Sequence, residues 1–292
     1  ARRRVPASYR KNSGRLMSDV FENWQGATKL VDVRKSNRWG AVYVALARGR
    51  ESFKWLTPMI AYGVGHPVLY LMSIGIGLGS LVSKNMGLVD GVSYLSYLAP
   101  ALLLAAALSA AVDETSFCVL QGFSWERGFY SMTQTAINAH QVASGVMLYA
   151  LFRVTWNSLV YGIILVLFGA LSPAAVPGQV LIAIVLGVSW GFAMLAYSSF
   201  IKEEGDWLVL VMRFVVAPMF MFSGTFYQME KMPELVQNIA WASPLWHATE
   251  LARNWSYGSP TNNALGHWLF LIALGLLGAA FAYPQFKRRL AR

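Results

Sequence analysis

The chain has 292 residues, of which 56% are hydrophobic and 14% aromatic, and its mean hydropathy is +0.44. This composition excludes a soluble domain built around one buried core and predicts a protein partly solvated by lipid. The formal net charge of +10 is gathered mostly in residues 1–54 and 287–292, which indicates membrane topology and argues against a nucleic-acid partner.

Residues 1–37 form a basic arm, and residues 38–54 mix aromatic and aliphatic side chains with arginines. Residues 1–30 lack the apolar run and small-residue cleavage site of a signal peptide, so we expect the membrane spans themselves to direct targeting. Residues 38–54 predict an amphipathic helix at the inner headgroup layer, where apolar groups dip into lipid and arginines meet anionic headgroups. A solvated linker is the alternative for this stretch.

Six stretches are apolar and long enough to cross about 30 Å of hydrocarbon, which takes roughly 20 residues. They are Trp55–Val82, Tyr94–Val112, Val146–Leu171, Val180–Phe200, Trp207–Phe222 and Trp268–Phe286. We therefore predict an all-α membrane protein with six transmembrane helices, whose transmembrane domain covers residues 55–286. Within the first span, Gly75 and Gly79 form a GxxxG pair that favours close packing of another helix.

The distribution of Lys and Arg predicts which side of the membrane each loop occupies. Residues 1–54 carry thirteen of these residues and the tail 287–292 carries four. The loops assigned to the outside contain only Lys84, Lys231 and Arg253. Both termini are therefore expected in the cytoplasm, with the protein in the plasma (inner) membrane of a bacterium.

The inner loop between the second and third spans contains a short predicted helix. Ser124 is its candidate N-cap, and Glu126 and Arg127 fall in its first turn. Exposed aromatic side chains beside a charged pair are typical of a partner contact, and a helix packed on its own protein or on the membrane is an equal alternative. The large side chains of this segment are Trp125, Phe129, Tyr130 and Met132.

The segment after the fifth span, residues 223–263, is too polar to cross the membrane. Pro233 is placed to begin one short helix, and Ser243 and Pro244 separate it from a second. Apolar rows on both helices cannot face water alone. The segment therefore predicts a re-entrant helical hairpin at the outer surface, dipping into the outer leaflet or closing a cavity.

Ionisable groups inside apolar spans are costly and need a partner or a function. Arg213 lies in the middle of the fifth span, where we expect a structural ion pair or contact with a polar substrate headgroup. Asp113 and Glu114 lie at the inner end of the second span, and they either pair with Arg127 or Arg153 or form a solvated helix end.

No metal or disulfide site is predicted. The single cysteine, Cys118, cannot form an internal disulfide, and we expect it to be a small buried apolar residue. The four histidines are scattered through the sequence without metal-ligand spacing, so a zinc enzyme is not expected. These histidines are His66, His140, His247 and His267.

The sequence contains no GxxxxGK[ST] motif, so this chain is not expected to bind ATP through a P-loop. If transport is driven by ATP, a separate ATPase must bind the inner loops. We therefore expect no cofactor in this chain, with ATP and Mg²⁺ held by the partner ATPase.

Several stretches along most of the chain resemble the ABC-2 type permease family, and within it the nodulation-factor or lipooligosaccharide exporter permeases of the NodJ kind. The stretches are residues 67–80 in the first span, Trp125-Glu126, Ala217–Phe226 with its Phe-Ser-Gly run, Met232-Pro233, Ser243–His247 and Leu251–Arg253. The chain differs from the family in a longer N-terminal arm and in Tyr227–Glu230, where the family often has Phe-Pro before an acidic residue.

This resemblance implies an N-terminal interfacial helix, six spans, a cytoplasmic coupling helix between spans two and three, and an external re-entrant hairpin. The coupling helix would be residues 125–133, and its contact residues are Trp125, Glu126, Arg127, Phe129 and Tyr130. The gate residues of the hairpin would be Phe222, Ser223, Gly224, Phe226, Tyr227, Pro233, Pro244 and Trp246. Candidates for the substrate path are Tyr70 and Arg213.

The resemblance further implies a working exporter of two permease chains, as a homodimer, and two ABC ATPase subunits. The predicted function is the permease subunit of an exporter for a glycolipid, a lipid-linked saccharide or a similar amphiphile, and not an enzyme. A drug or antibiotic efflux permease is the alternative within the class. From other classes, the alternatives are a membrane-embedded lipid-modifying transferase and a non-catalytic membrane scaffold.

Overall fold

The computed structural model describes residues 33–55, 57, 65–73, 77, 87–202, 206–259, 261 and 263–291. Nearly all of these residues are helical, and the described part of the chain contains no β-strand beyond one isolated bridge between Val89 and Val92. The predicted all-helical class is confirmed. The arm up to residue 32, the Gly75 and Gly79 pair and most of the predicted first span lie outside the described residues.

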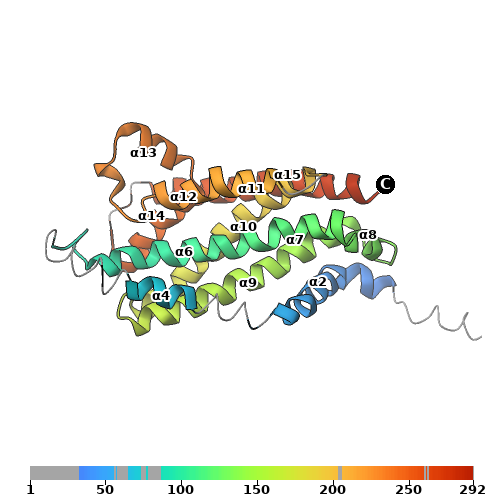
Figure 1. Ribbon diagram of the computed structural model, residues 1–292, viewed down its shortest axis with the longest axis horizontal. Coiled ribbons are helices and arrows are strands. Elements are labelled where there is room, and N and C mark those ends of the chain that lie inside the picture. Colours follow the sequence, from blue (N-terminus) through green and yellow to red (C-terminus); the bar gives the residue numbers. More distant parts are fainter. Residues whose placement is uncertain are drawn as a thin grey trace, which may run out of the picture.

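Four helical runs are long and apolar enough to cross a membrane, and they form the bundle in Figure 1. They are Tyr94–Trp125, Ala139–Leu167, Pro173–Phe200 and Ala264–Leu290. The first begins with α6 (Tyr94–Thr115), whose residues are mostly buried because α9 (Ala139–Leu167), α10 (Val176–Phe200) and α14 (Pro244–Tyr257) pack around it. The last is α15 (Ala264–Leu290), which packs along α10.

The predicted fifth span is a helical run in three short parts. These parts are α11 (Asp206–Val211), the π-helical turn η7 (Met212–Val216) and α12 (Ala217–Phe222). The run is shorter than the four helices that qualify as spans by length. In the predicted first span, the structure describes α4 (His66–Met72). The count of six spans therefore stays a prediction.

Several span boundaries differ from the sequence prediction, and two of them have a clear local cause. α9 begins at Ala139 rather than Val146, because Asn138 and Gln141 form a capping box that satisfies the first backbone amides. α15 continues to Leu290, with Lys287, Arg288 and Arg289 in its last turn. Basic side chains at this position favour the negative end of the helix dipole, so the helix extends past the apolar stretch.

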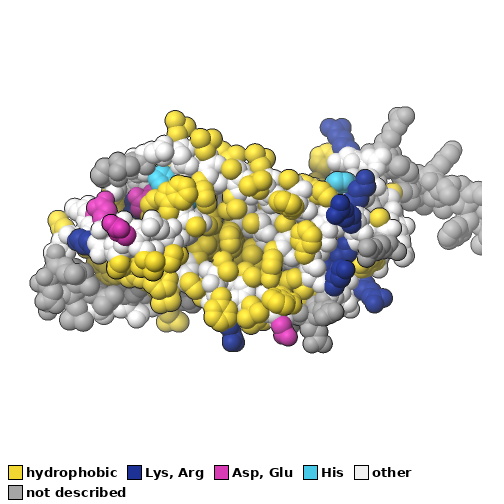
Figure 2. Space-filling view, turned by 90° about the horizontal axis from the view of Figure 1, so that it is seen from above, with side chains coloured by type: hydrophobic (Ala, Val, Ile, Leu, Met, Phe, Trp, Pro, Cys, Tyr) yellow, Lys and Arg dark blue, Asp and Glu magenta, His cyan; other side chains and the backbone are white. Residues whose placement is uncertain are grey.

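Charges are segregated along the length of the bundle. Figure 2 shows most Lys and Arg side chains gathered at one end, where Figure 1 places α8 (Gly128–Thr133) and the C-terminus. Most Asp and Glu side chains in this view lie toward the opposite end, where Figure 1 places α13 (Glu234–Trp241) and α14. We call these two ends the basic end and the hairpin end.

The N-terminal helix α2 (Val33–Ser52) is held against α9 and does not lie free at a surface. Val44 is buried over Gly145, whose missing side chain lets the two helices touch: a Cβ there would lie 2.4 Å from the Cβ of Val44. Gln141 donates hydrogen bonds to the carbonyls of Ser36 and Asn37. The helix begins at Val33, five residues before the predicted start, and its other face exposes Trp39, Tyr43 and Leu46.

Candidate functional site

The segment at the basic end, residues 121–133, exposes a charged surface supported by a buried aromatic anchor. Trp125 is 58% exposed, and Glu126 and Arg127 are also exposed. Arg127 adopts a left-handed conformation with φ +54°, which reverses the chain between the π-helical turn η5 (Gln121–Trp125) and α8. A compact exposed corner carrying one Trp and two opposite charges suits a protein contact.

The expectation that Phe129 is exposed on this segment is wrong. Its side chain is 2% exposed and packs edge-on against Phe123 at 5.0 Å and against Phe286 of α15. The ring fits because Gly122 leaves room for it: a Cβ at Gly122 would come within 2.5 Å of the ring. Phe129 thus fixes the segment to the bundle, and Tyr130 is half-buried beside it.

The predicted N-cap role of Ser124 is also wrong, because α8 begins only after Arg127. Ser124 instead accepts a 3.0 Å hydrogen bond from Nη2 of Arg289. Nη1 of Arg289 donates to the carbonyls of Ser199 and Ile201 at the end of α10, and the guanidinium lies over the ring of Phe123. Arg289 therefore ties the segment to α10 and α15 at once.

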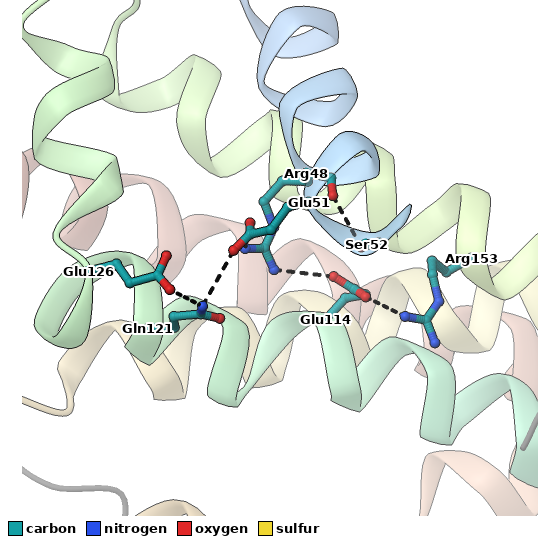
Figure 3. Close-up of polar contacts among 7 residues, drawn as sticks. All are labelled: Arg48, Glu51, Ser52, Glu114, Gln121, Glu126 and Arg153. Atoms are coloured by element: carbon teal, nitrogen blue, oxygen red, sulfur yellow. Dashed lines mark hydrogen bonds and ion pairs between the residues drawn. The ribbon is translucent and has the colours of Figure 1, made fainter. Parts of the chain in front are cut away.

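A buried ion-pair network connects α2, α6 and α9 at the basic end (Figure 3). Glu114 of α6 is 3% exposed; its Oε1 lies 2.6 Å from Nη1 of Arg153, and its Oε2 lies 3.4 Å from Nη2 of Arg48. The sequence alternative of a solvated helix end is therefore wrong for Glu114, and the predicted pairing with Arg153 is confirmed. The second partner, Arg48, comes from α2 and was missed, because a contact across 66 residues leaves no local pattern.

Figure 3 shows the same network reaching the exposed corner. Nη1 of Arg48 lies 3.2 Å from Oε2 of Glu51, and Nε2 of Gln121 lies 3.4 Å from Oε1 of that residue. The same Nε2 donates a 2.7 Å hydrogen bond to Oε1 of Glu126. A continuous chain of polar contacts thus runs from the exposed Glu126 to the buried Glu114, close to Ser116, the non-helical residue where α6 ends.

At the hairpin end, the predicted Phe-Ser-Gly run forms the bend that leads into the hairpin. Gly224 has φ +73°, a conformation that side chains rarely adopt, and Ser223 is buried 2.6 Å, Oγ to Oγ, from Ser243. Nη2 of Arg253 donates a 2.6 Å hydrogen bond to the Gly224 carbonyl, and its guanidinium lies 3.9 Å from the ring centroid of Tyr97. The Leu-Ala-Arg and Phe-Ser-Gly motifs therefore meet in space.

The hairpin itself has the predicted two helices, α13 and α14. Pro233 is the N-cap of α13, and Ser243 and Pro244 begin α14. Tyr94, at the start of α6, donates a 3.2 Å hydrogen bond from its hydroxyl to the carbonyl of Phe226. Other predicted gate residues lie around the bend: Phe222 is exposed, Tyr227 and Trp246 are half-buried, and Pro244 is buried.

The structure brings together two histidines that were expected to be scattered. Nδ1 of His247 on α14 lies 2.6 Å from Nδ1 of His267 on α15, and both side chains are buried. Nε2 of His247 lies 2.8 Å from the carbonyl oxygen of Trp241. A carbonyl oxygen can only accept a hydrogen bond, so Nε2 of His247 carries the proton. Nδ1 of the neutral His247 therefore accepts a hydrogen bond from Nδ1 of His267. Burial lowers the pKa of His247 to about 4. No larger cluster of possible metal ligands occurs in the described residues.

The two candidates for a substrate path lie apart from these clusters. Tyr70 is half-buried in α4 and packs against the core. Arg213 is exposed in η7, next to the exposed Phe214 and the half-buried Met212. It forms no ion pair with another described residue. The expected structural ion pair is therefore not found within the described part of the chain.

Known proteins resemble this chain along most of its length. Residues 46–256 match the family model described as ABC-2 type transporter. Nodulation protein J of Rhizobium leguminosarum bv. viciae is 25% identical over 246 residues, covering 83% of this chain and 93% of the relative. Nodulation protein J of Bradyrhizobium diazoefficiens is 25% identical over 261 residues, covering 87% and 94%. The matched segment extends from α2 to the end of α14, and the chain therefore belongs to the ABC-2 type transporter family.

Proposed function

We propose that this chain is the permease subunit of an ATP-driven exporter that moves a glycolipid, a lipid-linked saccharide or a similar amphiphile outward across the plasma membrane. Family membership supports a transmembrane transporter subunit, and the similarity to Nodulation protein J extends over most of the chain. ATP and Mg²⁺ would bind a separate ATPase, in keeping with the absence of a P-loop motif from the sequence.

The observation that carries this proposal is one helical run with a different contact at each end. The run Tyr94–Trp125 has 32 residues and is about 48 Å long, given the rise per residue of an α-helix. Trp125 is exposed at its basic end, and Tyr94 and Tyr97 hold the bend of the hairpin at its other end. A push on the basic end would pass to the hairpin along this run, which is helical on both sides of Ser116.

The ion-pair network gives this push a defined route. Glu126 lies at the exposed corner, and its contacts continue through Gln121, Glu51 and Arg48 to Glu114. We propose that an ATPase binds the corner formed by Trp125, Glu126 and Arg127. ATP binding would then shift the population between a closed and an open arrangement of the hairpin.

The proposed assembly contains six spans, with both termini in the cytoplasm, and a second copy of the chain. The run from α11 to α12 exposes Trp207, Phe214, Met221 and Arg213. An exposed arginine in an apolar helix is costly in lipid, so a neighbouring permease chain and the substrate headgroup are its proposed surroundings. Gathering of Lys and Arg at the basic end supports a cytoplasmic position for that end (Figure 2).

The proposal is tested with the chain co-expressed with the ATPase that purifies with it, in lipid nanodiscs. We expect Trp125→Ala and Glu126→Arg each to lower the permease-dependent part of ATP hydrolysis by roughly tenfold, since hot-spot residues contribute about 2 kcal/mol or more. Trp156→Ala is the matched control, because Trp156 is 62% exposed on α9 and lies outside the corner. Equal hydrolysis in all three variants would contradict the proposed ATPase contact.

The cargo is tested separately, by mass spectrometry of surface glycolipids in cells carrying the wild-type chain or Glu126→Arg. We expect one glycolipid class to move from the outer surface to the inner pool in the variant. Unchanged glycolipids together with increased retention of a drug would favour the alternative, a drug or antibiotic efflux permease.

Topology is accessible because Cys118 is the only cysteine. In a Cys118→Ser background, single cysteines at Glu234 and Ser131 are compared, since both positions are exposed and lie at opposite ends of the bundle. We expect a membrane-impermeant maleimide to label intact cells at position 234 and not at position 131. The reverse pattern would overturn the proposed orientation.

A further inference from the structure

A cavity of about 660 Å³ lies at the hairpin end, among α13, α14 and the turn that precedes α6. Its volume falls within the range of about 300–1,000 Å³ that is usual for small-molecule sites. No residue of the cavity belongs to the ATPase-facing corner. The turn before α6 carries Asp90, with φ +50°, and Gly91, with φ +77°, and Nε2 of Gln228 donates to Oδ1 of Asp90.

The base of the cavity holds three polar groups without a hydrogen-bond partner among the described residues. They are Nε1 of Trp246, Nε of Arg253 and the hydroxyl of Tyr257, and each atom is buried. Arg253 is only 3% exposed, so its unused N–H is far from bulk solvent. All three groups can donate a hydrogen bond, and a buried donor without an acceptor is unfavourable. The base therefore fits a ligand that presents acceptor oxygens.

The upper part of the cavity has the opposite character. Three carboxyl groups and one arginine line the cavity: Asp90 and Glu230 are exposed, and Glu250 is half-buried. The charge of Arg253 is already shared with the Gly224 carbonyl, the Tyr97 ring and Glu250 at 3.8 Å. A phosphate or another anion would meet repulsion here, whereas a group that donates hydrogen bonds would not.

An aromatic wall completes the site. The ring of Trp241 is 60% exposed at the edge of the cavity, and Trp246 lies deeper, edge-on to His267 at 5.1 Å. Two amides, Gln237 and Asn238, line the same opening. A flat aromatic face suits a ring whose C–H groups are apolar, and the amides both donate and accept.

One class of ligand fits the buried donors, the carboxyl groups and the aromatic wall together. A sugar hydroxyl accepts from the donors at the base and donates to the carboxylates above, while the C–H face of the pyranose stacks on an indole. A purely cationic amine would leave the donors of Trp246, Arg253 and Tyr257 unpaired. We propose that this cavity binds a neutral saccharide as an exit site for the sugar portion of the exported amphiphile, which rests on the export function proposed above.

The test uses the full chain in lipid nanodiscs and saturation-transfer NMR with three neutral tetrasaccharides, namely maltotetraose, cellotetraose and chitotetraose. We expect at least one of them to bind saturably at concentrations up to about 10 mM, a range that detects free energies of a few kcal/mol. Inorganic phosphate at the same concentration should not displace the sugar. Displacement by phosphate would overturn the neutral class of ligand.

Conservative variants locate the binding. Tyr257→Phe and Trp246→Phe keep the rings and remove one unpaired donor each, and we expect each to weaken binding roughly five- to tenfold. Trp241→Ala removes the exposed stacking face and should weaken binding by a similar factor. Tyr43→Phe on α2 and Trp156→Ala on α9 are the matched controls and should leave binding unchanged, since neither residue lines the cavity.

Two results would overturn this site: no saturable binding of any neutral sugar, or binding that is equal in the wild type and in all three cavity variants. Thermal midpoints of the variants separate loss of a contact from loss of folding. Binding does not require ATP hydrolysis, so failure of this site is distinguishable from failure of the ATPase contact at Trp125 and Glu126. If sugar binds and neither variant at that corner alters hydrolysis, the export proposal fails while the saccharide site stands.

Discussion

Arg253 donates a 2.6 Å hydrogen bond from Nη2 to the carbonyl oxygen of Gly224, joining two residues that lie 29 positions apart. The bond crosses from α14 to the bend at which the chain enters the hairpin. Gly224 bends the chain with a positive φ, and its carbonyl also accepts a 3.5 Å hydrogen bond from the Tyr97 hydroxyl. This contact closes the base of the hairpin.

Replacement of Arg253 is therefore expected to open the hairpin. Arg253→Met leaves the Gly224 carbonyl with only the 3.5 Å hydrogen bond from the Tyr97 hydroxyl and removes the cation from the Tyr97 ring, and we expect a loss of about 2–4 kcal/mol in unfolding free energy. Thermal unfolding in detergent measures the change. Lys231→Met is the control, because Lys231 is exposed in the polar segment of the hairpin, and it should change stability by less than about 0.5 kcal/mol. Equal midpoints for the two variants would show that the hairpin does not depend on Arg253.

Loss of the Glu114 charge is expected to release α2 from the bundle. Glu114→Gln leaves Arg48 and Arg153 near each other without the carboxylate that neutralises both, and we expect about 3–5 kcal/mol of destabilisation. Hydrogen exchange of α2 amides measures the release.

Arg48→Met is the informative comparison for Glu114. This variant removes one arginine and leaves Glu114 paired with Arg153 at 2.6 Å, so its effect should be clearly smaller. If Arg48→Met were as damaging as Glu114→Gln, the packing of the Arg48 stem and not the ion pair would hold α2.

A side chain at Gly145 is expected to displace α2 by steric contact alone. Gly145→Ala places a methyl group 2.4 Å from the Cβ of Val44 and 2.7 Å from the carbonyl oxygen of Ala41, which neither helix can accommodate without moving. We expect faster proteolysis of the N-terminal segment and a loss of about 1–3 kcal/mol. Gly128→Ala is the matched control, because a Cβ at Gly128 has no neighbour within 4 Å; comparable proteolysis in both would contradict the close contact.

Variants at Phe129 and Trp125 are expected to affect different properties, the stability of the fold and the coupling to the ATPase. Phe129→Ala removes a buried ring from the contact with Phe123 and Phe286, and we expect a loss of about 3–5 kcal/mol. Trp125→Ala removes an exposed ring and should change stability by less than about 1 kcal/mol while lowering permease-dependent ATP hydrolysis. Thermal midpoints and hydrolysis rates, measured on the same samples, check the two effects. A large stability loss in Trp125→Ala would mean that its ring packs on the bundle.

Stability is expected to fall as the pH drops through the range in which His247 titrates. The pKa of His247 is lowered to about 4 in the folded chain and is near 6.5 when unfolded, so the unfolded state binds the proton first. The loss begins near pH 6.5, grows to about 3 kcal/mol near pH 4 and is constant below that. Thermal midpoints across this range measure it, and His247→Asn should flatten the slope. An unchanged slope in His247→Asn would assign the pH dependence to another group.

Much of the architecture follows from local features of the sequence. Three of the predicted spans agree with the bounds of α6, α10 and α15 to within a few residues. Uninterrupted apolar runs are stable only against lipid or other protein, so their helices can be located from the sequence. The two helices of the hairpin were predicted from Pro233 and Ser243-Pro244, since proline is favoured at the start of a helix. The apolar spans and the two helices of the hairpin thus follow from the sequence itself.

Contacts between distant segments were decided only by the tertiary structure. The ring of Phe129 is buried because Gly122 leaves space for it and Phe286 of α15 packs against it. The hydrophobic periodicity of a six-residue helix does not predict such a contact. Likewise, Arg48 meets Glu114, and His247 meets His267, only after α2 and α15 have packed. The sequence by itself determined which segments must be helical and apolar, because backbone groups in lipid must pair locally. The tertiary structure decided which polar side chains share a buried site, because burying a charge is tolerable only where another element supplies its partner.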